Sequence, residues 1–374
     1  MEQPNTVSIF EMVERVAPEL EERSDRHDRE GTFVGESYAR LKELGFFRAG
    51  VPVELGGGGA THAELCDALR RLAHACPATA LAAAMHTHLV AATVFRYRKG
   101  QGGEPMLRRV AAEGLVLVST GAGDWLESSG ELERVDGGYR LTAKKPFGSG
   151  SPAGDVMITS SVYRDPAEGE QVLHFPVPFK APGVSLAGDW NSLGMRGTGS
   201  HTIQLEGVFV PDASIVLKRP RAGWHPVWTV VLTVAAPIYM APYLGVAELA
   251  RERALAHARK LRERADVPLL VGEMDNALMT ARLAYQSLVA NAANYDFTPE
   301  LDRATHALTT KTLVANAAQL TVDKAAELAG GLGYLRRGGI ERLLRDVRGA
   351  PNHPLPEKRQ QILTGRVALG LTPV

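Results

Sequence analysis

The chain has 374 residues, enough for a sizeable core and more than one domain, and 45% of them are hydrophobic, as in a soluble globular protein. Lysine plus arginine and aspartate plus glutamate both number 42, so the net charge is zero, which argues against nucleic acid as the main partner because phosphate binding needs a basic excess. The two cysteines, Cys66 and Cys76, lack metal-ligand spacing, so we expect no metal site and interpret them as reduced core thiols of a cytosolic protein.

Residues 1–113 are predicted to form an N-terminal α-helical domain. The N-terminus has no basic region followed by an apolar one, so we expect no signal peptide and a cytoplasmic location. Helical periodicity and end signals mark 18–30, 36–45, 62–75 and 78–97. The last of these segments carries His86 and His88, which face nearly opposite ways on a helix and therefore cannot both line one pocket or share a metal ion.

Residues 114–223 are predicted to form a middle β domain, a barrel or sandwich. Short alternating segments rich in β-branched residues cover 114–120, 131–135, 138–143, 155–163, 171–179 and 201–210. Gly-Gly, Gly-Ser and Asp-Pro turns separate them.

Residues 224–374 are predicted to form a C-terminal four-helix bundle, with long helices over about 227–262, 271–294, 299–330 and 357–370. The segment 227–247 has no charged residue and is about long enough to span a bilayer. Because it holds two prolines and is the only such run, we expect a helix buried within the bundle and no integral membrane segment, with peripheral membrane attachment as the alternative. No GxGxxG motif follows a strand, so no Rossmann-type nicotinamide site is expected.

The first candidate binding segment is GYRLTAKKPFGSGSPAGD, residues 138–155. A strand ends at the aromatic Phe147, and glycines then alternate with Ser149 and Ser151. Glycines let a backbone approach a flat ligand closely, and a hydroxyl can hydrogen-bond to a ring nitrogen. An ordinary serine-rich turn is the alternative.

The second candidate segment is LGMRGTGSHTIQLEGVFVP, residues 193–211. Arg196, Thr198 and Ser200 alternate, so in an extended strand their side chains point the same way, while His201 points the other way. The alternative is a solvated polar face.

The third candidate segment is GGLGYLRRGGIERLLRDVR, residues 330–348. Its first glycines follow a long helix and are interpreted as a helix cap. The charged residues that follow are Glu341, Arg342, Arg345, Asp346 and Arg348. They suit either a surface helix or an ion-pair network that fixes a loop.

These three segments, in this order on a helix–sheet–helix layout, resemble the acyl-CoA dehydrogenase superfamily over nearly the whole chain. STGAGDW at 119–125 resembles the threonine-led loop of that family, and KKPFGSG at 144–150 resembles its lysine, aromatic and hydroxyl motif beside the flavin. LGMRGTGSHTIQLEGVFVP and GGLGY…IERLLRDVR resemble its strand motif and the start of its last helical section. The resemblance implies an α+β fold with a helical domain, a β domain and a four-helix bundle in that order.

The resemblance also implies a flavin site, for FAD or FMN. The residues that it assigns to cofactor binding are Thr120, Phe147, Ser149, Arg196, Thr198, Gly330 and Gly331. In the family the two glycines approach the cofactor from a neighbouring subunit, which suggests a homotetramer or a homodimer. Trp125, directly after the threonine-led loop, is expected either to shape the pocket or to belong to the core.

The sequence departs from the family where a catalytic base is needed. Dehydrogenation of an acyl-CoA requires a carboxylate that removes the α proton. One family position for it falls on Pro354 here, and the other lies on the segment 227–247, which has no Asp or Glu. Glu357 follows Pro356 at a predicted helix start, which capping and the helix dipole explain without catalysis. A motif of arginine followed by glutamine, phenylalanine and glycine is also missing, which argues against tight, permanent binding of FAD.

A histidine, His353, stands in that loop instead, between Asn352 and Pro354. This resembles the oxygenase branch of the superfamily, which includes the dibenzothiophene monooxygenases and takes reduced flavin from a separate flavin reductase. Imidazole titrates near neutrality, so His353 is expected to hydrogen-bond or to exchange a proton near the flavin and substrate, with a surface loop histidine as the alternative. A second histidine of that branch comes from the helical domain, for which we prefer His88 over His86, although a histidine in a helix interface is the competing interpretation.

The leading hypothesis is therefore a two-component flavin-dependent monooxygenase acting on a small apolar or aromatic molecule. The first alternative is an acyl-CoA dehydrogenase with a non-standard base. The second is a non-catalytic flavin- or ligand-binding protein.

Overall fold

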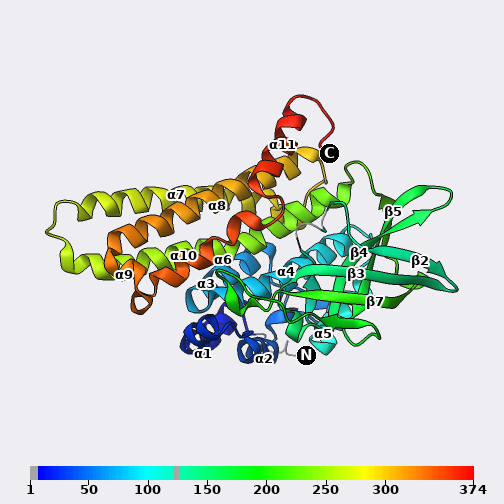
Figure 1. The fold of residues 1–374 in the computed structure, drawn as a ribbon, viewed down its shortest axis with the longest axis horizontal. Coiled ribbons are helices and arrows are strands. Elements are labelled where there is room, and N and C mark those ends of the chain that lie inside the picture. Colours follow the sequence, from blue (N-terminus) through cyan, green and yellow to red (C-terminus); the bar gives the residue numbers. More distant parts are fainter. Residues whose placement is uncertain (1–6, 122–123, 125) are drawn as a thin grey trace.

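The computed structural model describes residues 7–121, 124 and 126–374, which fold as helices, then a sheet, then helices (Figure 1). The predicted α+β class and the order of its parts are confirmed. The sheet lies at one end of an elongated molecule, and the long helices of the C-terminal part extend to the other end. Trp125 lies outside the described residues.

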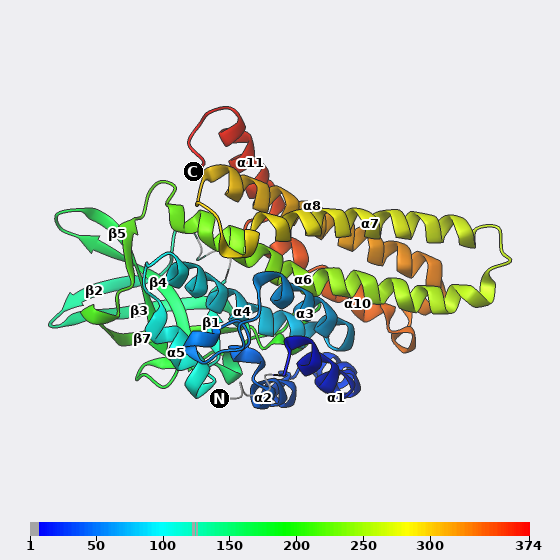
Figure 2. The same ribbon diagram turned by 180° about the vertical axis from the view of Figure 1, so that it is seen from behind.

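The N-terminal helices are α1 (Ile9–Glu30), α2 (Gly35–Leu44), α3 (His62–Ala75), α4 (Pro77–Arg98) and α5 (Glu104–Glu113). Reciprocal side-chain caps fix two of their starts, between Ser8 and Glu11 at α1 and between Thr61 and Glu64 at α3. Figure 2 shows α3 and α4 beside the first long helix of the C-terminal part, and both pack against it. The N-terminal and C-terminal helices therefore share one hydrophobic core.

The strands are β1 (Leu117–Ser119), β2 (Glu131–Val135), β3 (Gly138–Gly148), β4 (Val156–Asp165), β5 (Gly169–Pro178), β6 (Val184–Leu186), β7 (His201–Pro211) and β8 (Leu217–Pro220). They pair in the order β6-β7-β3-β2-β4-β5-β8, and β1 pairs in parallel with β4. Inward-facing residues such as Leu141, Phe175 and Ile203 form a second, smaller core. The sheet thus brings the ends of β1 and β3 and the start of β7 toward the helices.

The C-terminal helices are α6 (Pro226–Ala258), α7 (Val267–Asn291), α8 (Leu301–Ala329), α9 (Gly331–Tyr334), α10 (Ile340–Val347) and α11 (Glu357–Ala368). By length and composition α4 and α6 are long and apolar enough to cross a membrane, but 78% and 89% of their apolar windows are buried inside the fold. This burial agrees with the prediction of a core helix over 227–247. Helix α10 packs against both α6 and α8, and α11 packs against α8.

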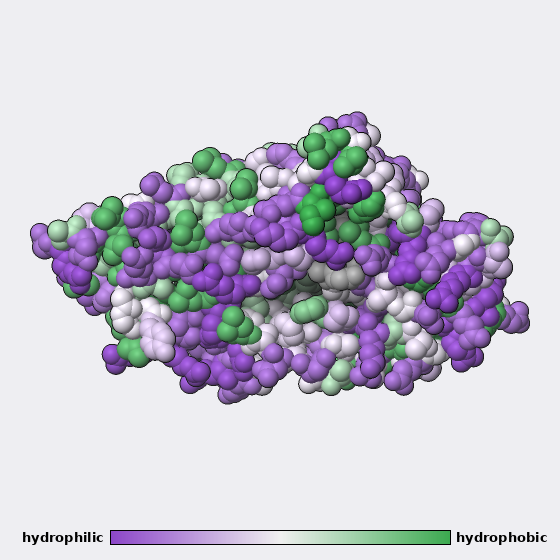
Figure 3. Space-filling view, turned by 45° about the horizontal axis from the view of Figure 1, so that its top comes forward, coloured by the Kyte–Doolittle hydropathy of each residue, from purple (hydrophilic) through white to green (hydrophobic). Residues whose placement is uncertain are grey.

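The surface differs between the sheet end of the molecule and the region around α11. In Figure 3 hydrophilic residues dominate the sheet end, and hydrophobic residues gather near the top centre, where Figure 1 places α11. Exposed apolar side chains in and after α11 include Ile362, Leu369 and Leu371.

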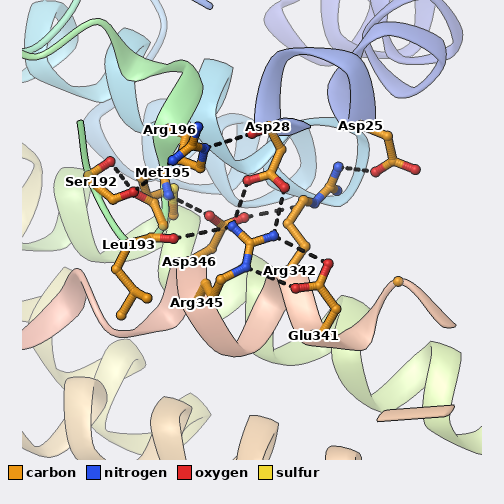
Figure 4. Close-up of polar contacts among 12 residues, drawn as sticks. Asp25, Asp28, Ser192, Leu193, Met195, Arg196, Glu341, Arg342, Arg345 and Asp346 are labelled. Carbon is orange, nitrogen blue, oxygen red and sulfur yellow. Dashed lines mark hydrogen bonds and ion pairs between the residues drawn. The ribbon is translucent and has the colours of Figure 1, made fainter. Parts of the chain in front are cut away.

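An ion-pair network joins α10 to α1 and to the loop before β7 (Figure 4). The guanidinium of Arg345 donates to both carboxylate oxygens of Asp28, at 2.8 and 2.6 Å, and its Nε donates to Glu341 at 2.9 Å. The buried carboxylate of Asp346 accepts the backbone N–H of Met195 at 2.5 Å. The structure therefore bears out the ion-pair interpretation of this charged segment.

The loop that this network holds is not the extended strand that the alternation of residues 196–200 predicts. Arg196–Thr198 form a 3₁₀ turn, Gly199 is left-handed, and β7 begins only at His201. Arg196 therefore turns away from Thr198, and its Nε donates to the carbonyl oxygen of Asp28 at 2.7 Å. The shared direction of the three side chains was a wrong prediction, because it assumed strand geometry where glycines allow a turn.

We expect Arg345→Met to lower the free energy of unfolding by about 3 kcal/mol, because it leaves the carboxylate of Asp28, 14% exposed, without its cation. Urea denaturation monitored by circular dichroism measures the change. The matched control is Arg264→Met, which removes a pair with Asp266 whose side chains are 61% and 52% exposed and should cost less than about 0.5 kcal/mol. Equal losses in the two variants would contradict the role given to the network.

Candidate active site

A cavity of about 440 Å³ opens where α4, α6, the sheet and the segment after α10 meet. Its volume falls in the range of small-molecule sites. Most of its lining is apolar, from residues such as Leu81, Met85 and Leu232. Besides His88 of α4 and two tyrosines of α6, polar groups enter from three places that are far apart in the sequence: the ends of β1 and β3, the loop before β7, and residues 345–354.

None of the described residues that line this cavity is an aspartate or a glutamate. Pro354 does line it, at the position where the family resemblance locates a base. Glu357 does not, because its carboxylate accepts hydrogen bonds from Asn316 at 3.2 Å and Gln361 at 2.9 Å at the start of α11. The structural interpretation of Glu357 therefore agrees with its contacts.

Glu248 is a further carboxylate on α6, just beyond the uncharged segment. It is buried outside the cavity lining, where Arg70 and Arg282 bind it at 2.5 and 2.8 Å. Burial alone would raise its pKa, but His74 and these arginines lower the pKa to about 2. A carboxylate so firmly ionised and paired is a poor proton acceptor.

His353 lies in the cavity wall between two tyrosines of α6. Its Nε2 shares a hydrogen bond of 2.8 Å with the hydroxyl of Tyr243, and its ring stacks on Tyr239 with centroids 4.8 Å apart. Burial, together with the nearby Lys311 and His88, lowers the pKa of His353 to about 3. The expectation that this imidazole titrates near neutrality is therefore wrong, because that value applies to a solvated ring.

A buried lysine holds the backbone on both sides of His353. Lys311 of α8 is 1% exposed, and its Nζ donates to the carbonyl oxygens of Leu355 at 3.0 Å and Pro351 at 3.3 Å. Burial lowers the pKa of Lys311 to about 8. Tyr239 adds a third bond, from its hydroxyl to the carbonyl oxygen of Pro354 at 2.9 Å.

Three residues of the site were not predicted from the sequence: Lys311, Tyr239 and Tyr243. The two tyrosines are four positions apart on an apolar helix, which puts them on one face, and this was the signal available in the sequence. Lys311 lies in a periodic helix, where a lone lysine ordinarily indicates a solvated face. Only the tertiary structure shows that it is buried against the loop.

The two histidines of α4 face different surroundings, as their spacing predicts. His86 is 1% exposed, and its Nε2 donates to the carbonyl oxygen of Phe47 at 2.7 Å while its Nδ1 accepts the backbone N–H of Leu117 at 2.9 Å. His88 lines the cavity instead. Burial lowers the pKa of both rings to about 4, so both are neutral at pH 7.

The predicted cofactor residues divide into two groups. Thr120, Phe147, Ser149 and Thr198 all line the cavity. The others do not: Arg196 binds the backbone of α1, and Gly330 and Gly331 lie at the end of α8. The structure therefore does not bring these three into the site of their own chain.

Two glycines on the polar side of the cavity pack directly against neighbouring backbone. A Cβ atom on Gly121 would lie 2.6 Å from the carbonyl oxygen of Pro146, and one on Gly194 would lie 2.2 Å from that of Arg345. Neither position can therefore carry a side chain. With the hydroxyls beside them, they make a wall suited to a flat ring that has polar ring atoms.

Comparison with known proteins identifies relatives of this architecture. Models of the acyl-CoA dehydrogenase N-terminal and C-terminal domains match residues 6–113 and 222–351. The amino sugar nitrososynthase DnmZ of Streptomyces peucetius is 30% identical over 367 residues, which cover 92% of this chain and 89% of that protein. Other relatives, 26% and 25% identical, are named as dehydrogenases of CoA thioesters.

Solved structures resemble the chain over nearly its whole length. The structure of KijD3 in complex with FMN and a dTDP-linked amino sugar is 25% identical, with a TM-score of 0.88 over 99% of this chain and 95% of that one. Dibenzothiophene monooxygenase TdsC from Paenibacillus sp. A11-2 is 21% identical, with a TM-score of 0.85 over 98% and 99% of the two chains, a likeness of fold. The structures of KijD3 and of TdsC include FMN-bound forms, and the wall of Thr120, Ser149 and Thr198 fits a flavin ring system.

We expect His86→Ala to lower the free energy of unfolding by about 2–4 kcal/mol, because it leaves two buried backbone groups unpaired and opens a void. His88→Ala should cost about 1 kcal/mol or less, since His88 lines a cavity that already exists. Urea denaturation of both variants measures the difference. A larger loss in His88→Ala would contradict the assignment of the two rings.

Lowering the pH from about 7 to about 5 should destabilise the protein through His86, by roughly 1 kcal/mol per pH unit. Its folded pKa of about 4 lies below that of an unfolded histidine, so the stabilisation is present above about pH 6.5 and is lost as the pH falls through this window. His86→Gln retains a donor and an acceptor but cannot titrate. Its free energy of unfolding should therefore fall less steeply, and an unchanged slope would refute the assignment.

Proposed function

The chain belongs to the acyl-CoA dehydrogenase family, and on that premise we propose that it is a flavin-dependent monooxygenase that transfers one oxygen atom from O₂ to a small molecule bound in the cavity. One observation carries the proposal: among the described residues, no carboxylate lines the cavity, and the neutral His353 lies in its wall.

The proposal follows from what desaturation of a thioester would require. A base must remove the α proton while the flavin accepts a hydride, and a carboxylate suits this task. The pKa of about 3 makes the imidazole of His353 a weak base, and His88 at about 4 is little stronger. Oxygen transfer to an electron-rich atom needs no such base, which is why this chemistry suits the cavity better.

The protein's own residues would bind and orient the substrate and the cofactor, and would exclude water. Reduced flavin supplies two electrons, so that one atom of O₂ enters the substrate and the other leaves as water. Tyr243 holds one ring nitrogen of His353, and the stacking of His353 on Tyr239 fixes the ring plane. The apolar side chains of α4 and α6 keep bulk water from the reacting atoms.

For the oxygen acceptor we propose a primary amine on a small molecule. DnmZ is named for an amino sugar and KijD3 holds one, and these relatives support an amine over the apolar or aromatic molecule that the sequence suggests. A cavity lined by no carboxylate among the described residues has no counter-ion for an ammonium group, so the amine should enter as its free base. The free base carries the lone pair to which oxygen is transferred.

Two partners belong to this proposal. A separate flavin reductase would supply the reduced cofactor, in keeping with the absence of a Rossmann-type motif in the sequence. A second copy of the chain would bring Gly330 and Gly331 to the cofactor, and exposed apolar side chains such as Leu283 and Leu320 of α7 and α8 support such an interface.

Oxygen transfer is tested with chemically reduced FMN, isotopically labelled O₂ and a panel of amino sugars, dTDP-linked amino sugars and indole. We expect one labelled atom in an amine product, and a yield lowered at least about tenfold by His353→Ala. Glu357→Gln is the control, because a carboxylate at the start of α11 should not matter. Anaerobic bleaching of bound oxidised flavin by an acyl-CoA thioester, abolished in Glu357→Gln, would overturn the proposal in favour of dehydrogenation.

A further inference from the structure

We propose that the hydroxyl groups of the cavity wall select reduced flavin over oxidised flavin, because each hydroxyl already donates its proton to another atom of the protein. The inference rests on the proposed function for its ligand and deepens it, since it concerns which redox form the site retains. It depends on two hydrogen-bonded arrangements, one that starts at Ser149 and one at Thr120.

The first arrangement is a chain of three hydroxyls, Ser149, Ser200 and Thr198. Thr198 Oγ1 lies 2.9 Å from the carbonyl oxygen of Met195 and 2.7 Å from Ser200 Oγ, which lies 2.8 Å from Ser149 Oγ. A carbonyl only accepts, so Thr198 donates to Met195. Ser200 must then donate to Thr198, and Ser149 to Ser200. All three contacts can be hydrogen bonds only if the protons are donated in this one direction along the chain.

The second arrangement fixes the proton of Thr120. Its hydroxyl lies 3.0 Å from Oδ2 of Asp124, and a carboxylate only accepts. Asp124 is held as a carboxylate, because Lys145 binds both of its oxygens at 2.7 Å and the N–H and hydroxyl of Ser129 each donate to it at 2.6 Å. The ion pair is almost fully buried, with side chains 0% and 1% exposed. Thr120 therefore has no proton left to offer to the cavity.

The consequence is a wall that presents lone pairs and no hydroxyl protons at Thr120, Ser149, Thr198 and Ser200, all of which line the cavity. The oxidised flavin ring carries acceptors at N1 and N5 and one N–H at N3. Two-electron reduction places a proton on N5 and, in the neutral form, on N1 as well. Hydroxyls that only accept pair with these added N–H groups but face the acceptor nitrogens of the oxidised ring with lone pair against lone pair.

This polarity suits a protein that takes reduced flavin from a partner and releases the oxidised form after turnover. A dehydrogenase needs the opposite preference, because its resting cofactor is oxidised. The same hydroxyl residue types serve either purpose, so residue identity alone does not distinguish them. The distinction lies in where each proton is placed, and the carbonyl of Met195 and the carboxylate of Asp124 determine that here.

The test is the dissociation constant of oxidised and of chemically reduced FMN, measured anaerobically by ultrafiltration on the full-length protein. We expect reduced FMN to bind at least about tenfold more tightly. Ser200→Ala removes the acceptor for the Ser149 proton. This variant should reduce the difference in affinity between the two redox forms, because it should bind oxidised FMN more tightly. Thr120→Val removes an acceptor and should reduce this difference in affinity, because it should bind reduced FMN more weakly.

The control is Ser214→Ala, which removes a hydroxyl-to-carbonyl bond on an exposed turn remote from the cavity and should leave the gap unchanged. Equal affinity for the two redox forms, or a gap that neither cavity variant changes, would overturn the inference. Equal affinity with oxygen transfer intact would refute this inference alone. A redox gap that responds to both variants, without oxygen transfer to any substrate, would support it and refute the proposed function alone.

Discussion

The hydrogen bond from the backbone N–H of Met195 to the buried carboxylate of Asp346 is the contact on which the site depends. Met195 is held in the left-handed region, with φ of 52°, which is costly for a residue with a side chain. Asp346 compensates by accepting the N–H of Met195, while the carbonyl oxygen of Met195 accepts the proton of Thr198. One residue thus links the ion-pair network of α10 and α1 to the polarity of the cavity wall. The geometry of the contact between α10 and the loop before β7 and the chemistry of the site are therefore coupled.

The electrostatic character of the cavity follows from burial. With no carboxylate among its described lining residues, nothing offsets the cost of desolvating an imidazolium, so His353 and His88 are neutral. The positive charge of the buried Lys311, held by backbone carbonyls of the His353 loop, reinforces this. A largely apolar site with directed hydroxyls, neutral imidazoles and only the arginines Arg345 and Arg348 as charged groups in its described lining is a poor place to deprotonate a thioester and a suitable one for an uncharged nucleophile.

Much of the fold could be predicted from the sequence, because its signals are local. Capping residues, apolar periodicity and strand alternation mark the helix–sheet–helix order, and the composition of the charged segment at 341–348 suits either an ion-pair network or a surface helix. The turn at Arg196 was missed although Gly197 and Gly199 flank Thr198, because alternating polar residues fit a strand equally well. The cavity positions of Thr120, Ser149 and His353 were accessible through family resemblance and not through spacing.

The remainder could not be predicted because it is set by contacts between distant segments. The depressed pKa of His353 arises from burial between α6, α8 and α4, and no sequence motif encodes that. The role of Lys311 depends on a loop 40 or more positions away. Proton directions in the hydroxyl chain require the position of one carbonyl oxygen, that of Met195, which a turn supplies and a strand would not.

A crystal structure of the protein with flavin bound tests the central claim most directly. We expect no carboxylate among the polar groups within about 4 Å of the reacting face of the ring, and His353 to be one of those groups. An aspartate or glutamate carboxylate at that face, from this chain or from a second copy, would contradict it and would restore desaturation of a thioester as the better explanation.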